Sequence, residues 1–193
     1  MKRAFLGLCL VSCADARHPT VSEPAGPPPS AVVIGSVAGS TPVTITRLPN
    51  NGWDEKNRTT LLQTGALDFV KTGDGISYEV SAGYYVSLEF ENIPKDSTVM
   101  AVKLHATYDE EAGFAPGAAL WQVGVGTLTS PIVAMEMRPE GFGNTLTWDL
   151  TPWVRTATRV NDLMLTVRNL DPLGKKVFVD QASLEITYGP TAP

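Results

Sequence analysis

Apolar and polar side chains alternate over much of the last third of the chain. Residues 145–150 run TLTWDL, residues 162–169 run DLMLTVRN, and residues 176–188 run KVFVDQASLEITY. A period of two with one apolar face is typical of a strand that packs one side against a core. These three segments therefore predict three strands of a half-buried sheet.

The same period recurs upstream. Residues 84–91 and 99–108 alternate most regularly, and shorter apolar runs occupy 31–37, 43–48, 120–125 and 132–137. Gly, Pro, Asn and Asp clusters separate these runs and predict chain reversals. Among them we expect a turn at 49–52, an irregular polar segment at 53–65, and a hairpin around Gly73 and Gly75 that joins strands at 67–71 and 76–80.

Helical periodicity is absent from every window longer than two turns, apart from one short turn that Pro152 could begin. We therefore predict an all-β fold, an antiparallel two-sheet sandwich of jelly-roll type with about nine or ten strands and at most one short helical turn. A closed barrel is the alternative. Residues 31–190 are expected to form a single domain.

The first 30 residues have a different composition. Lys2 and Arg3 precede a short apolar run, as in an export signal over residues 1–16, and the run is too short to span a bilayer as a helix. Two processing sites compete, lipidation at Cys13 and ordinary cleavage after Ala16. Residues 17–30 contain five prolines and predict an extended linker. We expect an exported protein, either secreted or held at the outer membrane or cell surface. A short N-terminus of a cytoplasmic or viral protein is the alternative.

The composition limits the kinds of binding partner that we expect. The net charge is −5, with no basic patch, so nucleic acid is not an expected partner. The two cysteines, Cys9 and Cys13, both precede the expected domain, so that domain has neither a disulfide nor a thiolate metal site. Membrane contact is expected only through a lipid on Cys13. Association of identical copies stays open.

One block carries a resemblance to a known group of proteins. The sequence WDLTPWV at 148–154, VNDLML at 160–165 and VFVDQASLEI at 177–186 resemble jelly-roll, galactose-binding-like modules of extracellular bacterial proteins, a group that includes carbohydrate-binding modules. The resemblance covers about the last 45 residues and implies a surface or secreted protein that binds glycans or mediates adhesion. It implies no catalysis. Related strands often have a second acidic residue where this chain has Gln181 after Asp180.

The sequence offers few candidate catalytic residues. Outside the linker the only histidine is His105, which the alternation places mid-strand on the outer face, and no nucleotide or zinc motif occurs. We therefore expect no enzyme activity, with glycoside hydrolysis as the minor alternative. The carboxylates considered for it are Asp109, Glu110, Glu111, Glu136, Glu140 and Asp180.

Calcium is the one metal considered, because it prefers several oxygen ligands from loops. Asp109, Glu110 and Glu111 form the best local cluster, and we expect any ion there to be structural. Asp74, in its Gly-rich turn, is another candidate. A solvated acidic loop is the favoured interpretation, and no cofactor is expected.

Exposed aromatic rings are the candidates for ligand binding, since a sugar stacks its C–H face on such rings while polar neighbours contact its hydroxyls. Trp53, Tyr85, Phe114 and Phe142 are expected to be exposed, and Trp53 is favoured because its polar segment offers no partner strand. Trp121, Trp148 and Trp153 are expected in the core or under a loop.

Two functions follow as hypotheses. The favoured one is a non-catalytic binding module, tethered or secreted, for a glycan or another cell-surface molecule. The alternative is a structural or assembly subunit, such as an adhesin, filament, coat or viral decoration protein. It predicts an exposed apolar patch or an unprotected edge strand, and residues 31–48 are the suspected segment.

Overall fold

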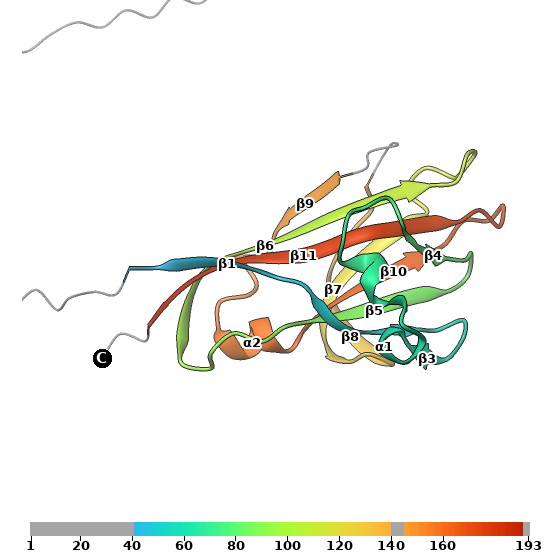
Figure 1. Cartoon of the computed structure of the whole chain (residues 1–193). Helices are drawn as coiled ribbons and strands as arrows, with labels where there is room; N and C mark the ends of the chain where they lie inside the picture. Colours follow the sequence, from blue (N-terminus) through green and yellow to red (C-terminus); the bar gives the residue numbers. More distant parts are fainter. Residues whose placement is uncertain (1–40, 140–144, 191–193) are drawn as a thin grey trace, which may run out of the picture. The chain divides into compact units, whose positions relative to one another are not determined.

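Two antiparallel β-sheets make up most of the structure (Figure 1). The computed structural model describes residues 41–139 and 145–190. Eleven strands lie in these ranges, and the two sheets are separate rather than closed into a barrel. The predicted all-β, antiparallel two-sheet sandwich is confirmed, with one or two strands more than expected.

The first sheet has the strand order β1-β11-β6-β9. The short strand β4 also pairs with β11, on the edge that β1 occupies further along the strand. Its members are β1 (Val43–Arg47), β4 (Tyr78–Val80), β6 (Ser97–Glu110), β9 (Thr145–Asp149) and β11 (Val177–Pro190). The two long strands β6 and β11 pair along almost their whole length, so they form the central pair of this sheet.

The second sheet has the order β3-β2-β5-β10-β7-β8. Its members are β2 (Pro49–Asp54), β3 (Thr59–Thr60), β5 (Tyr85–Phe90), β7 (Ala119–Thr127), β8 (Ser130–Met137) and β10 (Leu163–Asn169). Strand β10 lies between β5 and β7, which makes it a central strand.

The hydrophobic core joins the inner faces of both sheets. The alternating residues predicted to point inward are buried, including Leu146 on β9, Leu165 on β10 and Leu184 on β11. Truncating one such leucine to alanine typically costs about 2–5 kcal/mol. Trp121 and Trp148 are buried as expected, and Trp153 packs partly buried against the same core.

Strand β10 departs from the one-sided pattern. Met164 and Thr166 point away from the core face yet are buried, and the Thr166 hydroxyl hydrogen-bonds the Ser87 hydroxyl of β5 at 2.9 Å. Both faces of this central strand are therefore buried, which the alternating pattern does not predict.

The turn predicted at 49–52 is wrong, because these residues belong to β2. A register irregularity separates Pro49 from Asn51, and the Asn51 side chain accepts the Gly52 N–H at 2.9 Å. A Cβ added to Gly52 would lie 2.7 Å from Leu61 Cδ1, so the glycine allows close packing instead of a chain reversal.

The hairpin predicted at 67–80 is also wrong. Helix α1 (Leu61–Thr64) begins with a capping box at Thr60 and ends at Gly65 in the left-handed conformation. The 3₁₀ helix η1 (Ala66–Val70) follows and buries Leu67 and Val70 at a spacing of three. Strand β4 pairs with β11 instead. Tertiary packing thus selected a helical turn where the composition suggested a strand.

The helical content therefore exceeds the predicted single turn. Residues 150–154 do form a short turn, in which the Leu150 carbonyl accepts the N–H groups of Trp153 and Val154. The second α-helix, α2 (Ala157–Asn161), starts later, after a Thr156 cap. Each helical segment has no more than five residues, in line with the absence of longer helical periodicity.

A polar hub fixes the connection between β10 and β11. Asn169 is fully buried, and its amide donates to the carbonyls of Val80 and Lys175 at 2.8 and 2.7 Å. The Asp171 carboxylate accepts N–H groups from Ala115, Leu173 and Lys175. We call this cluster the Asn169 hub. It ties together three segments that are distant in sequence.

Candidate functional site

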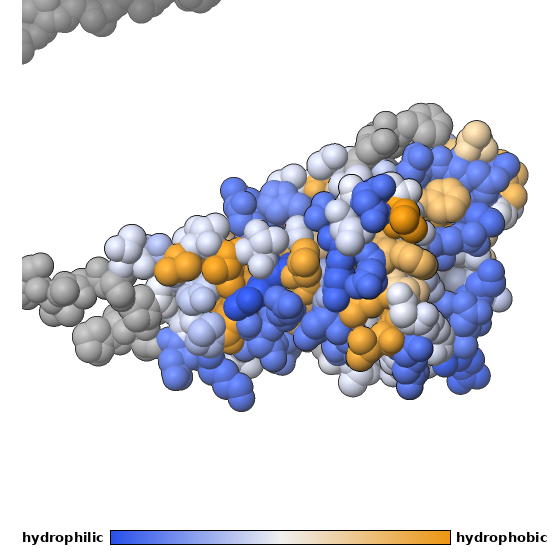
Figure 2. All heavy atoms as spheres, viewed as in Figure 1, coloured by the Kyte–Doolittle hydropathy of each residue, from blue (hydrophilic) through white to orange (hydrophobic). Residues whose placement is uncertain are grey.

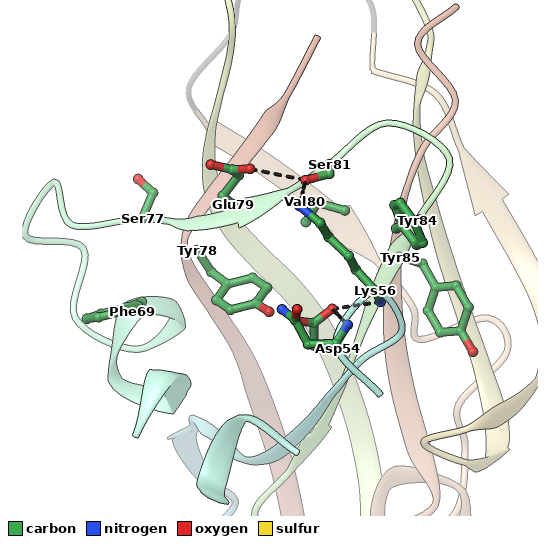
Figure 3. Close-up of a pocket in the computed structure, with 11 residues that line it drawn as sticks. Asp54, Lys56, Phe69, Ser77, Tyr78, Glu79, Val80, Ser81, Tyr84 and Tyr85 are labelled. Carbon is green, nitrogen blue, oxygen red and sulfur yellow. Dashed lines mark hydrogen bonds between the residues drawn. The ribbon is translucent and has the colours of Figure 1, made fainter. Parts of the chain in front are cut away.

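Two neighbouring clefts share one lining residue, Tyr85 on β5. The first, about 310 Å³, is the Tyr78 cleft (Figure 3). Its lining comprises Asp54, Lys56, Asn57, Phe69, Ser77, Tyr78, Glu79, Val80, Ser81, Tyr84 and Tyr85. The second, about 510 Å³, is the Trp53 cleft, lined by Trp53, Glu55, Arg58, Tyr85 and Thr129. Both volumes fall in the range of small-ligand sites.

The turn after β2 supplies residues to both clefts, and Asp54 builds it. Its carboxylate accepts the backbone N–H groups of Lys56 and Asn57 at 2.9 and 3.2 Å, together with the Asn57 side-chain amide. Such a pattern is how aspartate nucleates a tight turn. Figure 3 shows the Tyr78 ring pointing toward this carboxylate from β4. Burial and the hydrogen bond to Asp54 raise the pKa of Tyr78 well above its usual range, so its hydroxyl stays protonated.

A chain of polar contacts crosses the rim of the Tyr78 cleft. Lys56 Nζ donates to Ser81 Oγ at 2.8 Å, and Ser81 Oγ donates to Glu79 Oε1 at 3.1 Å. Glu79 Oε2 in turn accepts from Lys176 Nζ at 2.8 Å. The hydrogen bond from Lys176 lowers the pKa of Glu79. The rim therefore presents an ionised carboxylate next to a lysine and a hydroxyl.

Tyr85 is held from two directions. The guanidinium carbon of Arg168 lies 4.7 Å from the centre of its ring, across the β5–β10 pairing that sets these residues opposite each other. Its hydroxyl donates to the carbonyl of Thr129 at 3.4 Å, in the β7–β8 connection. A cation over an aromatic face is attracted by the ring electrons, so the ring is positioned before any ligand arrives.

The Trp53 cleft combines an aromatic wall with two charges. Trp53 lies on β2 opposite Ser87, on the outer face that also carries Tyr85. Glu55 and Arg58 come from the turn that Asp54 holds, and Arg58 has a positive φ of 53°. Neither charged side chain forms an ion pair with any residue in the described part of the chain.

Two carboxylates line the Tyr78 cleft. The two carboxylates of the Tyr78 cleft are Asp54, which holds the turn, and Glu79, whose pKa lies below its usual range. A general acid for glycoside hydrolysis needs a raised pKa. The lowered pKa of Glu79 does not match that requirement.

Of the four predicted ligand-binding aromatics, the structure brings two together. Trp53 and Tyr85 line the same cleft. The expected irregular surroundings of Trp53 are wrong, because it pairs with β5 and β3 on β2. Phe114 is only 5% exposed and belongs to the core, so its expected exposure is wrong. Phe142 lies outside the described residues.

The acidic cluster at 109–111 does not form a calcium site in the structure. Strand β6 extends through Glu110, so Asp109 and Glu110 occupy successive strand positions rather than a loop. Burial, with smaller contributions from Asp109 and Asp171, raises the pKa of Glu110. Glu111 instead pairs with Lys175 at 3.2 Å. Within 41–139 and 145–190 no group of three or more potential ligands is arranged for a metal.

Other singled-out residues have structural surroundings. His105 lies on β6, within 3.2 Å of the Thr147 hydroxyl and 3.9 Å of Glu185. Asp180 is buried and accepts the Gly75 N–H at 3.2 Å. Glu136 lies on β8, remote in the strand order from β2, which leads into the cleft turn, and Glu140 is outside the described residues.

Sequence reasoning missed most of the lining. Asp54, Lys56, Asn57 and Arg58 were treated as irregular polar chain, and Tyr78 and Tyr84 were not selected at all. The local sequence held one usable pattern, the run WDEKNR at 53–58, in which an aspartate precedes a polar turn beside a tryptophan. These residues and residues 77–85 line one cleft because of the pairing of β2 with β5 and of β4 with β11. The local sequence does not show that pairing.

Edge strands form the other notable surface. β8 ends the second sheet and exposes Ile132 by 67% and Val133 by 42%. β1 ends the first sheet, and Val43 on it is half-exposed. Figure 2 shows polar side chains over most of one face, with apolar areas near β1 and around η1 and α1.

Comparison with known proteins yields no relatives by sequence: no protein-family model and no curated protein matches the chain. Solved structures do match, among them the Tobacco streak virus coat protein, at 12% identity and a TM-score of 0.35 over 79% of this chain and 88% of that one. A chain of the Tomato aspermy virus structure matches at 13% identity and 0.33, over 60% and 76%. Similarity at this level carries no argument about function.

Several predictions concern residues without a described structure. The signal over 1–16, Cys13, the linker at 17–30 and the strand at 31–37 all lie outside the described residues. In the ranges that are described, no helix has the length and apolar character needed to cross a membrane.

Proposed function

We propose that this chain is a non-catalytic binding module for a glycan, and that the two clefts on either side of Tyr85 hold the ligand. The observation that carries the proposal is the adjacency of two clefts that share the lining residue Tyr85, each lined by aromatic and polar residues. An extended chain of sugars has this alternation of flat C–H faces and hydroxyl groups.

Each cleft offers both kinds of contact. The rings of Trp53 and Tyr85 give stacking surfaces in one cleft, and those of Tyr78, Tyr84 and Phe69 line the other. Lys56, Glu79 and Ser81 place donors and acceptors at the rim of the Tyr78 cleft. The held position of Tyr85 supports the proposal, because a preorganised wall loses little freedom on binding.

Export fits this role. We propose that Cys13 is lipidated and that the Pro-rich segment at 17–30 carries the domain away from the membrane surface. Mass spectrometry of the natural N-terminus tests this: an acylated Cys13 supports it, and a chain that starts at Arg17 contradicts it.

A glycan array probed with the full chain tests the binding function. We expect retention of at least one polysaccharide, weakened by about tenfold in Trp53→Ala, since loss of one aromatic contact in such a site costs about 1–2 kcal/mol. Leu62→Ala is the matched control, because Leu62 is exposed and lines neither cleft. If no glycan is retained at high protein concentration, the proposal fails.

A second function, assembly with other subunits, is favoured by the β8 edge. Exposed apolar residues on an edge strand with unpaired backbone groups can pair with another chain. Two features oppose this: Pro131 lacks an N–H group, and an irregularity interrupts the β8 pairing next to Val133.

Sedimentation over a wide concentration range separates the two functions. An assembly subunit associates, and Val133→Lys on the edge disrupts the association. A strict monomer at high concentration contradicts the assembly role and leaves the glycan proposal intact.

A further inference from the structure

Arg58 has an unusual backbone. Within residues 41–139 and 145–190 it is the one non-glycine residue with a positive φ, 53°. Side chains other than those of asparagine and aspartate rarely adopt this left-handed region, because Cβ crowds the backbone. Such strain persists where the surrounding structure enforces it, and here Asp54 and Asn57 fix the turn from its start.

The guanidinium of Arg58 is also without a partner. The side chain is exposed and lines the Trp53 cleft, yet it makes no hydrogen bond, ion pair or ring contact with any other described residue. Arg168, in contrast, is engaged on the ring of Tyr85. Among the residues that line the Trp53 cleft, Arg58 is therefore the cation that is available to a ligand.

We propose that the Trp53 cleft binds a sugar that carries a carboxylate, with Arg58 as the carboxylate-binding residue. The proposal rests on the proposed glycan-binding function and specifies its ligand. Two parallel N–H groups of a guanidinium match the two oxygens of a carboxylate. The rings of Trp53 and Tyr85 supply the stacking surface for the sugar ring beside it.

Glu55 places a negative charge in the same cleft, which opposes the binding of an acidic ligand. It lines the same cleft and is likewise unpaired, with no Glu55–Arg58 ion pair within 4.0 Å among the described ion pairs. Its carboxylate repels an acidic sugar but can accept hydrogen bonds from sugar hydroxyl groups. The whole chain has a net charge of −5, so a general attraction of polyanions is not expected. Selectivity for a carboxylate must therefore come from Arg58 locally.

Matched glycan pairs test the ligand class. The probes are polyuronides containing galacturonate, glucuronate or mannuronate, each beside its carboxyl-reduced, neutral form, and binding to the full chain is measured by calorimetry. We expect at least one acidic form to bind about tenfold more tightly than its neutral counterpart, and 0.5 M salt to reduce this difference.

Variants assign the effect to Arg58. Arg58→Gly accepts the positive φ without strain, so we expect its melting temperature to be unchanged or higher while the preference for the acidic form is lost. Glu55→Gln is expected to strengthen binding of the acidic form several-fold. Lys95→Gln removes an equal charge from an exposed residue that lines neither cleft, and it is expected to change nothing.

The outcomes separate the two proposals. If glycans bind but neutral forms bind as tightly as acidic ones, or if Arg58→Gly keeps the preference, the carboxylate site is wrong and the glycan function stands. If neither form of any probe is retained and the glycan array is also negative, the glycan function itself fails, and the carboxylate site fails with it.

Discussion

The turn at 54–58 and the Asn169 hub are both built around an aspartate, but their other polar side chains have different surroundings. In each, an aspartate at or just past the end of a strand accepts backbone N–H groups of following residues: Asp54 from Lys56 and Asn57, and Asp171 from Leu173 and Lys175. Both turns thus use a carboxylate to replace the backbone pairing that ends with the strand.

They differ in what the remaining polar groups contact. In the hub, Asn169 is buried with its amide fully engaged, and the Lys175 ammonium pairs with Glu111. In the turn at 54–58, Glu55 and Arg58 have no side-chain partner within the described chain and lie beside Trp53. Polar groups that are satisfied internally hold a fold together, whereas unsatisfied ones beside an aromatic wall are available to a ligand.

The largest expected effect comes from breaking the hub. Asn169→Ala leaves the carbonyls of Val80 and Lys175 without their donor in a buried site. We expect a loss of about 3 kcal/mol in the free energy of unfolding, measured by urea denaturation. Asn92→Ala, at an exposed position, is the control. A loss below about 1 kcal/mol contradicts the view that the hub is a structural tie.

Breaking the open turn is expected to act on binding instead. Tyr85→Ala removes an aromatic ring from the Trp53 cleft, so we expect about tenfold weaker retention of whichever glycan binds, with little change in stability. Calorimetric titration beside a melting curve measures both effects. A variant that binds normally shows that this ring is not part of a site.

Acid should weaken the hub selectively. Burial tends to raise the pKa of Asp171, but the N–H groups of Ala115, Leu173 and Lys175 outweigh it and hold the pKa below the usual 3.8. The stabilisation is therefore present above pH 3.8 and is lost as pH falls through the lower folded-state value. We expect Asp171→Asn to melt roughly 3–6 °C lower at pH 7, with the gap closing toward pH 2. A gap that persists at pH 2 contradicts this origin.

The smallest effect is expected at the rim of the Tyr78 cleft. The pKa of Glu79 is lowered by its Lys176 hydrogen bond, and the pKa of Lys176 is raised by the same contact. The stabilisation is present between the usual values of 4.5 and 10.5, and is lost on either side as one partner becomes neutral. Because both side chains are about two-fifths exposed, we expect Lys176→Met to lower the melting temperature by only about 1–2 °C at pH 7. A larger drop, or one that survives at pH 3, indicates another role.

The positions of the long strands are largely predictable from the sequence, and the wrong predictions fall where contacts with distant residues decide the local structure. Alternation located β5, β6, β10 and β11 to within about two residues, because one buried face imposes a period of two. The predictions are wrong at 49–52, where a turn is expected but β2 forms, and at 67–71, where a strand is expected but η1 forms. In the structure Gly52 admits Leu61 at close range, and Gly65 ends one helix before another begins.

The candidate site was predictable only in part. Trp53 and Tyr85 were identified as exposed aromatics, which local polarity can suggest, but their meeting depends on β2 pairing with β5. Phe114 was misplaced because a Gly/Pro-bearing loop was taken to be exposed, while its ring reaches the core. Nothing local distinguishes a loop aromatic that turns inward from one that turns outward.

The sequence by itself determined the all-β architecture and the inward face of the long strands, since both follow from the spacing of apolar side chains along a pleated strand. Tertiary structure alone decided that a turn after β2 and residues around β4 would form two neighbouring clefts with Tyr85 in the lining of both. It also decided which aspartates bind backbone and which charges stay available. Those outcomes depend on pairing between segments far apart in the chain, which no local pattern records.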